Sequence, residues 1–120
     1  MKKLFILFLV TSISLSSYAG LKEKHVIGKW TYKVELDQET LTGFLEFEKR
    51  EGKLEGRIIT ENGETYSFTK IEIKEKNILY LELRPDYDLI VITLKVEDGS
   101  YTGTGSTTNL SVTMTGEKMD

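Results

Sequence analysis

Apolar and polar residues alternate along almost the whole chain from residue 26 onward, and this period of two restricts the fold more than any other feature. Successive side chains of an extended strand point to opposite faces, so alternation is typical of strands that bury one face. An amphipathic helix would repeat its apolar residues every three or four positions, and no convincing segment of that kind is present. The sequence therefore predicts an all-β fold. The first strand shows the pattern, with predicted inward residues at Val26, Gly28, Trp30, Tyr32, Val34 and Leu36.

Turn signals divide the alternating region into eight predicted strands. Glu51-Gly52, Asn62-Gly63 and Asp98-Gly99 each place a polar residue before glycine, the combination that tight hairpin turns favour. All connections are short, so each strand is expected to pair with the next in an up-and-down antiparallel order. The predicted strands cover residues 26–36, 41–50, 53–60, 64–74, 77–84, 88–97, 100–106 and 110–118.

The fourth of these strands contains an irregularity. Its inward residues begin with Tyr66 and Phe68 but continue from Ile71, so the parity changes between them. One extra residue in a strand turns every later side chain to the opposite face. We therefore predict a β-bulge near Thr69-Lys70.

Eight neighbouring antiparallel strands with one apolar face each can close into a barrel, which removes both sheet edges. We therefore predict an eight-stranded antiparallel up-and-down barrel over residues 20–120, as a single domain. A barrel of this size encloses either a filled core or one small ligand.

The first 19 residues have the layout of a secretory signal peptide. Lys2 and Lys3 precede a short apolar run at residues 4–10, and a serine-rich stretch ends in small residues at Ala19 and Gly20. The apolar run is shorter than the about 20 residues that a membrane-spanning helix needs. We expect cleavage after Ala19 and an exported, soluble protein in the periplasm or outside the cell, without membrane insertion.

Charge and cysteine content exclude several classes of function. Two of the 16 basic residues and none of the 19 acidic residues precede residue 20, so the domain has a net charge near −5. Nucleic acids and anionic membrane surfaces are recognised by basic patches, so neither is an expected partner. The chain has no cysteine, which excludes disulfides, thiolate catalysis and zinc–thiolate sites.

The Gly28-Lys29-Trp30 segment of the first strand, together with the up-and-down strand order, resembles the calycin barrels, which include the lipocalins. In lipocalins the tryptophan of this motif lies at the closed end, and a basic side chain from the last strand packs over it. The resemblance implies that Gly28 and Trp30 have structural roles. Lys118 is the candidate for the basic residue, and a lysine there departs from the family pattern. The chain is also much shorter than a typical lipocalin, and its length resembles minimal lipocalin-like barrels of secreted bacterial proteins.

No residue constellation indicates catalysis, a metal site or a cofactor. His25 is the single histidine and has no nucleophile or acid motif around it, which favours a surface role. The serines lack the context of a nucleophile elbow. Asp86 and Asp88 can offer oxygen ligands, but no complete calcium-binding loop surrounds them. The expected protein is therefore a non-enzymatic binding protein.

Alternating strand directions sort the turns into two ends, and the end with room for a ligand is expected at residues 37–40, 61–63, 84–88 and 107–109. Six carboxylates lie near this rim against one cation, which disfavours an anionic ligand. We expect a neutral or cationic apolar or amphipathic ligand there. Inward glycines leave space, although they equally suit tight barrel bending. The six carboxylates are Asp37, Glu39, Glu61, Glu64, Asp86 and Asp88, and the predicted ligand-binding residues are Tyr32, Thr60, Tyr66, Arg84 and Gly105.

Two alternatives remain open at this stage. A protein partner can bind an outer face or the rim, as a periplasmic inhibitor would, and Phe44, Ile59, Tyr80 and Val91 are predicted to point outward. Isolated outward apolar residues are also ordinary in monomers. The other alternative is a purely structural barrel with a filled core.

Overall fold

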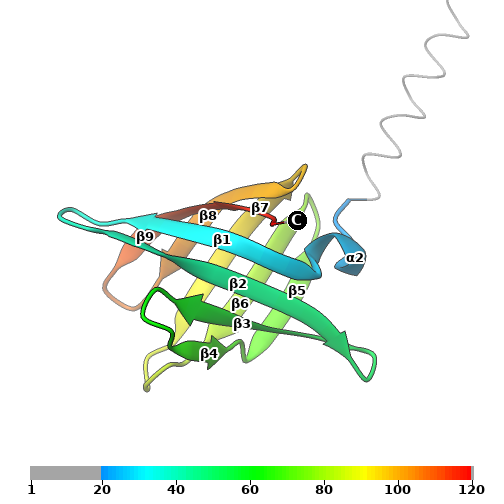
Figure 1. Ribbon diagram of the computed structural model, residues 1–120, viewed down its shortest axis with the longest axis horizontal. Helices are drawn as coiled ribbons and strands as arrows, with labels where there is room; N and C mark the ends of the chain where they lie inside the picture. The colour runs from blue at the N-terminus through cyan, green and yellow to red at the C-terminus, as the bar shows by residue number, and fades with distance from the viewer. Residues whose placement is uncertain (1–19, 120) are drawn as a thin grey trace, which may run out of the picture.

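The computed structural model describes residues 20–119, which form one antiparallel sheet of nine strands preceded by a helical turn. The strand order is β4-β3-β2-β1-β9-β8-β7-β6-β5. The sheet curls around a single core, so that Figure 1 shows β2 and β3 in front of β6 and β7. The elements are α2 (Glu23–Val26), β1 (Gly28–Glu35), β2 (Thr40–Arg50), β3 (Lys53–Thr60), β4 (Thr65–Ser67), β5 (Lys70–Lys74), β6 (Ile78–Leu83), β7 (Ile90–Glu97), β8 (Ser100–Ser106) and β9 (Ser111–Glu117).

The predicted all-β class and the up-and-down antiparallel order are confirmed. Two predicted strands, 53–60 and 100–106, have the bounds observed for β3 and β8. The tight turns have the expected backbone, with positive φ at Glu51, Gly52, Gly63, Asp98 and Gly99. Local turn chemistry and alternation therefore place most of the strands correctly.

The predicted number of eight strands is wrong, because the strand expected at residues 64–74 is divided into β4 and β5. The Phe68 N–H donates to the Gly56 carbonyl on β3, at 3.0 Å, so the first half of the segment pairs with β3. One residue later, the Thr69 N–H donates to the Glu82 carbonyl on β6, at 2.7 Å. Lys70 is also opposite Glu82. Thr69 and Lys70 therefore both lie opposite Glu82, which is the predicted β-bulge.

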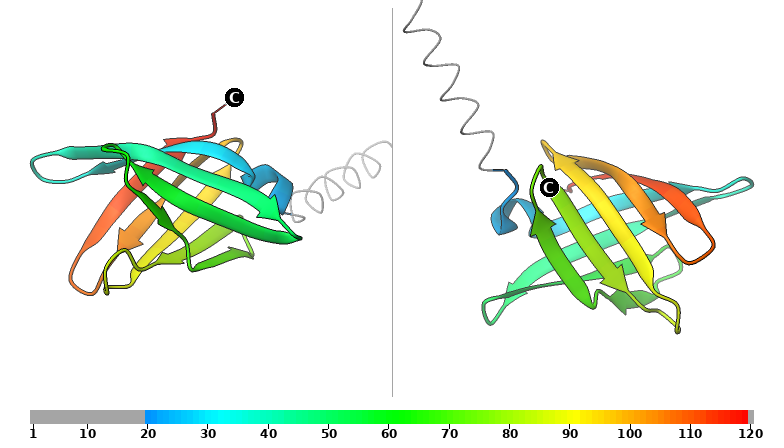
Figure 2. Two further views of the ribbon diagram at one scale, coloured as in Figure 1. Left: turned by 60° about the horizontal axis from the view of Figure 1, so that its bottom comes forward. Right: turned by 180° about the vertical axis from the view of Figure 1, so that it is seen from behind.

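The division leaves the barrel incompletely closed. In the described residues β4 pairs only with β3 and β5 pairs only with β6, so no continuous ladder joins the two ends of the sheet. Phe68 bonds to β3 and Thr69 bonds to β6, so the chain passes from one neighbouring strand to the other between these two residues. Figure 2 shows this curled sheet from two further sides.

The start of the first strand also differs from the prediction. Residues Glu23–Val26 form the helical turn α2, and β1 begins at Gly28. Val26 is nevertheless fully buried and belongs to the core cluster, and Figure 1 shows α2 at the end of the barrel. An ion pair of 2.8 Å between Glu23 and Lys49 links α2 to β2. Among residues 20–119 no helix is both long and apolar enough to cross a membrane.

The first and last strands, β1 and β9, are joined by direct pairing and by a tyrosine. β1 and β9 pair directly at Lys33↔Thr115 and Val34↔Met114. Nearer the start of β1, the Tyr101 hydroxyl crosses over Gly116 and donates to the Thr31 carbonyl at 2.7 Å. Position 116 has to be glycine, because a Cβ there would lie 2.5 Å from that hydroxyl.

The core extends from Val26 and Trp30 beside α2 to Val34 and Leu83 near the opposite turns. We call the end next to α2 the closed end, and it carries the turns at 51–52, 75–77 and 98–99; the open end carries those at 37–39, 61–63, 84–88 and 107–109. The buried residues come from seven elements and alternate along β1, β6 and β7, as the sequence predicts. They are Val26, Trp30, Tyr32, Val34, Leu45, Phe47, Leu79, Leu81, Leu83, Ile92, Leu94, Val96, Tyr101 and Met114.

Candidate functional site

The Trp30 arrangement closes one end of the barrel and is structural. Trp30 is 2% exposed, and its Nε1–H donates to the Val26 carbonyl at 2.9 Å. The Lys118 Nζ lies 5.7 Å from the centre of the indole ring, a cation–π contact, and donates to the His25 carbonyl. Gly28 has φ +133°, and a Cβ there would lie 2.9 Å from the Lys118 Cε. The structure thus brings Gly28, Trp30 and Lys118 together.

The interior next to Trp30 has no room for a ligand. The core side chains there pack so closely that no space for a water molecule remains between them. Gly43, an inward glycine of β2 opposite Tyr32, is covered by the Tyr32 ring, and a Cβ there would lie 2.6 Å from that ring. The same holds for Gly56, where a Cβ would lie 2.6 Å from the Phe47 ring. These inward glycines accommodate neighbouring aromatic rings.

Space is found at the open end instead, where β1 and β9 separate. β1 continues with β2 as far as Glu35↔Thr40, but its direct pairing with β9 stops at Val34↔Met114. The hairpin of β1 and β2 therefore projects past β9, as Figure 1 and Figure 2 show. A cleft of about 760 Å³ remains between residues 35–39 and residues 110–113. We call it the β1–β9 cleft.

The β1–β9 cleft combines apolar walls with acidic ones. Leu36 and Val112 are half-buried against the core, and Leu110 is 57% exposed. The turn of the β1–β2 hairpin adds the exposed carboxylates of Asp37 and Glu39, and it is closed by the Leu36 N–H donating to the Glu39 carbonyl. Such a cleft fits the apolar part of an amphipathic molecule beside a neutral or positive group.

Two of the predicted ligand residues are tyrosines beside acidic groups of the open end. Tyr32 is 7% exposed, and its burial together with the charge of Glu61 raises the pKa of its hydroxyl. Tyr66 is half-buried. Desolvation, followed by the negative charges of Glu64 and Asp86, raises the pKa of the Tyr66 hydroxyl. Both phenols therefore stay neutral at ordinary pH within a negative field.

The other predicted ligand residues are engaged within their own turns or packed. The Thr60 hydroxyl contacts Asn62 at 2.5 Å and accepts from the Glu64 N–H at 3.1 Å. The Arg84 guanidinium donates to the Tyr87 carbonyl at 3.1 Å. The Thr60 hydroxyl thus stabilises the turn at residues 61–63, and the Arg84 guanidinium stabilises the turn at residues 84–88.

Gly105 is buried beneath the side chains of β9. A Cβ at this position would lie 3.4 Å from the Met114 Sδ and 3.7 Å from Val112, which is ordinary packing distance. Gly105 therefore supports the wall of the β1–β9 cleft through Val112. The predicted set does not converge on one point, and the sequence reasoning missed Leu36 and Leu110 as cleft residues. The sequence signal that could have identified them is an apolar residue at the edge of each of two open-end turns, Leu36 before 37–40 and Leu110 after 107–109.

The outer apolar residues form separate patches. Phe44 and Ile59 are directly opposite on β2 and β3, and the Lys29 Nζ covers the Phe44 ring at 4.6 Å. Tyr80 lies on β6, far from them in the strand order, with the Lys74 Nζ 4.2 Å from its ring. A lysine ammonium group thus lies over each ring.

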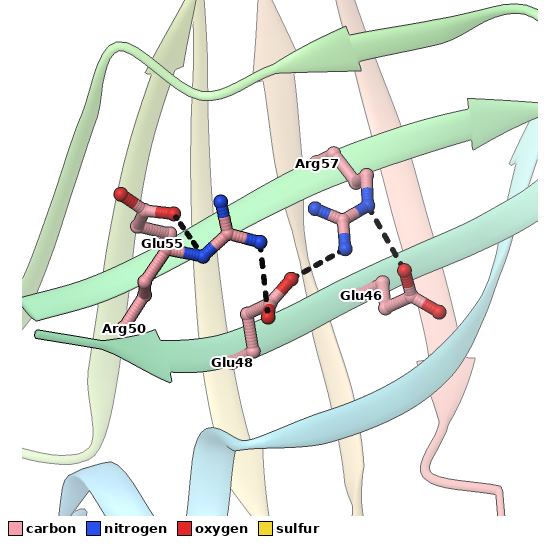
Figure 3. A network of polar contacts seen from close by, with 5 residues as sticks. All are labelled: Glu46, Glu48, Arg50, Glu55 and Arg57. Carbon is pink, nitrogen blue, oxygen red and sulfur yellow. Dashed lines mark hydrogen bonds and ion pairs between the residues drawn. The ribbon is translucent and has the colours of Figure 1, made fainter.

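The outer face of β2 and β3 also carries an ionic network, drawn in Figure 3. The Arg57 guanidinium bonds Glu46 at 2.9 Å and Glu48 at 2.6 Å. Arg50 lies 3.7 Å from Glu48 and 3.8 Å from Glu55. The network links neighbouring strands along the β2–β3 hairpin, which agrees with a structural role for this face.

Comparisons with known proteins give a likeness of fold. No family model matches the sequence, and neither does any curated protein. A redesigned β-barrel superposes with a TM-score of 0.61 at 15% identity, covering 81% of this chain and 94% of that one. A fatty acid binding protein of Schistosoma mansoni, in complex with arachidonic acid, superposes with a TM-score of 0.53 at 10% identity, covering 80% and 97%. The fold is that of a calycin-type β-barrel. At these identities the likeness extends to the fold and no further.

Proposed function

We propose that this calycin-type barrel is a non-enzymatic binding protein that holds a small apolar or amphipathic ligand, neutral or cationic, at its open end. The observation that carries the proposal is the β1–β9 cleft, with Leu36, Leu110 and Val112 beside Asp37 and Glu39. Most of the other residues that line the cleft are polar, which favours an amphipathic ligand over a wholly apolar one. A filled closed end directs the ligand to this cleft.

The charge of the rim argues for a different ligand class from that of the structural neighbour. That neighbour is in complex with arachidonic acid, a carboxylate. Here the cleft is bordered by the carboxylates of Asp37 and Glu39. An anionic head group would be repelled by these carboxylates, whereas an ammonium group would be attracted to them.

Titration calorimetry with three dodecyl amphiphiles tests the charge preference: a trimethylammonium, a maltoside and a sulfate, each below its micellar concentration. We expect the cationic member to bind most tightly at low salt, with a smaller preference at high salt because screening weakens exposed charges. Preferential binding of the sulfate, unaffected by Arg84→Ala, would contradict the proposal. Absence of saturable binding for all three would favour the structural barrel.

Two variants locate the site. Leu110→Ser removes apolar area from the cleft wall and is expected to weaken binding of the preferred amphiphile about tenfold. Met119→Ser is the matched control, because Met119 is an exposed apolar residue (42%) beside the start of β1 at the closed end. Equal effects of Leu110→Ser and Met119→Ser would place the ligand elsewhere.

We further propose that the protein acts after export, since residues 1–19 have the composition of a signal peptide. This segment lies outside the described residues. Intact-mass analysis of protein expressed with the full sequence in a bacterial host is expected to give a chain that starts at Gly20. Retention of residues 4–10 in the purified protein would contradict export by this route.

A further inference from the structure

The most unusual feature outside the β1–β9 cleft is the gap where the sheet fails to close. It lies between residues 53–55 of β3 and the whole of β5, which have no partner strand on their facing edges within the described residues. A groove of about 640 Å³ follows this gap, bounded by Leu21, Leu54, Ile71 and Ile73. We call it the β3–β5 seam.

The backbone groups that face the seam from β5 follow from the hydrogen-bond alternation. The Val96 N–H donates to the Asn77 carbonyl, so odd-numbered residues of β6 bond to β7 and even-numbered ones bond to β5. The partners of the even-numbered residues are Lys70, Glu72 and Lys74. The N–H and C=O groups of the two residues between them, Ile71 and Ile73, therefore point into the seam.

The same alternation fixes the opposite edge. Gly56 accepts from Phe68, and the Thr60 N–H donates to Glu64, so even-numbered residues of β3 turn their backbone groups towards β4. β4 ends before it reaches Leu54. The backbone groups of Leu54 therefore face the seam as well. Two sheet edges with unsatisfied groups confront each other across an apolar groove, and each is a template for another strand.

We propose that the β3–β5 seam binds an extended peptide segment of a partner protein by strand addition. The segment would bond through its backbone to Ile71 and Ile73 on one side and to Leu54 on the other, and its inward side chains would pack on Leu21 and on those three residues. This site is independent of the ligand site at the open end.

The charges around the seam select the partner. On the outward face Glu55 pairs with Arg50, and Lys70 lies 3.9 Å from Glu72. Lys53 and Lys74 have no ion-pair partner among residues 20–119, and lysines outnumber glutamates on the outward faces of residues 53–55 and 70–74. A peptide that alternates apolar and acidic residues fits both faces. A second copy of β5, centred on Glu72, would place lysine opposite lysine and is disfavoured.

The probe is a short acetylated peptide in which valine and glutamate alternate, with the valine–lysine peptide as its counterpart. Affinity for the fluorescently labelled peptides is measured by anisotropy. Ile73→Pro removes one N–H that faces the seam and leaves the β5–β6 hydrogen bonds in place. We expect it to weaken binding about threefold to tenfold, the effect of one hydrogen bond, relative to Ile73→Ala, which keeps the N–H.

Thr65→Pro is the matched control. Thr65 also lies on an unpaired edge, because even-numbered residues of β4 bond to β3, but it belongs to the other half of the divided strand. It should leave peptide binding unchanged. Hydrogen exchange on the unmodified chain provides a test that needs no variant. The peptide is expected to slow exchange of the Leu54, Ile71 and Ile73 amides. Tighter binding of the lysine peptide, unchanged exchange at these three amides, or no binding at millimolar peptide would overturn the proposal.

Discussion

Replacing Trp30 with alanine tests whether the closed end carries the stability of the barrel. The side chain is 2% exposed and contacts Tyr101, with ring centres 5.9 Å apart. A tryptophan buries roughly 150–250 Å², which at about 25 cal/mol per Å² is about 4–6 kcal/mol. Alanine recovers a small part of this, so the expected loss is about 3–5 kcal/mol, the range measured for buried aromatic residues.

The lost hydrogen bond adds to this figure. The indole N–H donates to the Val26 carbonyl, and such a bond contributes about 1 kcal/mol. The sum is a large part of the about 5–15 kcal/mol that holds a domain of this size. We therefore expect Trp30→Ala to be unfolded or close to it at room temperature. Trp30→Phe keeps a ring in the core and should fold, with a loss of about 1–3 kcal/mol.

Urea denaturation followed by far-ultraviolet circular dichroism is the suitable assay, because the substitution removes the single tryptophan that fluorescence would use. The free energies of unfolding of the unmodified chain and both variants are compared at one temperature. A loss below about 1.5 kcal/mol for Trp30→Ala would refute the reasoning, since a buried side chain of this size cannot leave a cavity so cheaply. Trp30 would then be available for binding.

Three further predictions concern packing and charge. Gly43→Ala should destabilise the chain by about 1–3 kcal/mol and lower its melting temperature, because the new Cβ overlaps a tyrosine ring and a backbone carbonyl. Gly105→Ala should change the melting temperature little, because its Cβ would lie 3.4 Å or more from its neighbours. Tyr101→Phe should cost about 1 kcal/mol in urea denaturation through loss of its bond to β1, and no loss would contradict its clamping role. The hydrogen bond from Arg57 lowers the pKa of the Glu48 carboxyl below its usual 4.5, so Glu48 stabilises the fold above that pH and this contribution disappears as pH falls through the lowered pKa. Glu48→Gln should therefore flatten the fall in melting temperature below pH 4.5. An unchanged pH profile of the melting temperature in this variant would contradict the prediction.

The sequence by itself determined the features that depend on neighbouring residues. Alternation identified the strands and their inward faces, since strand side chains have a fixed period of two. Polar–glycine pairs marked the hairpin turns, and the observed positive φ values agree. The parity change after Phe68 was enough to predict the bulge at Thr69-Lys70, because a single inserted residue is a local event that the pattern records.

The tertiary structure decided what depends on distant residues. Whether the 64–74 segment pairs with both neighbours is set by the curvature of the whole sheet, so the sequence could not show that β4 and β5 would separate and leave a seam. The space at Gly43 is taken by a ring from β1, and the space of the β1–β9 cleft exists because two hairpins diverge. Alternation states which face of a strand is buried, but the curvature of the sheet determines which side chains fill that face and where it stays open.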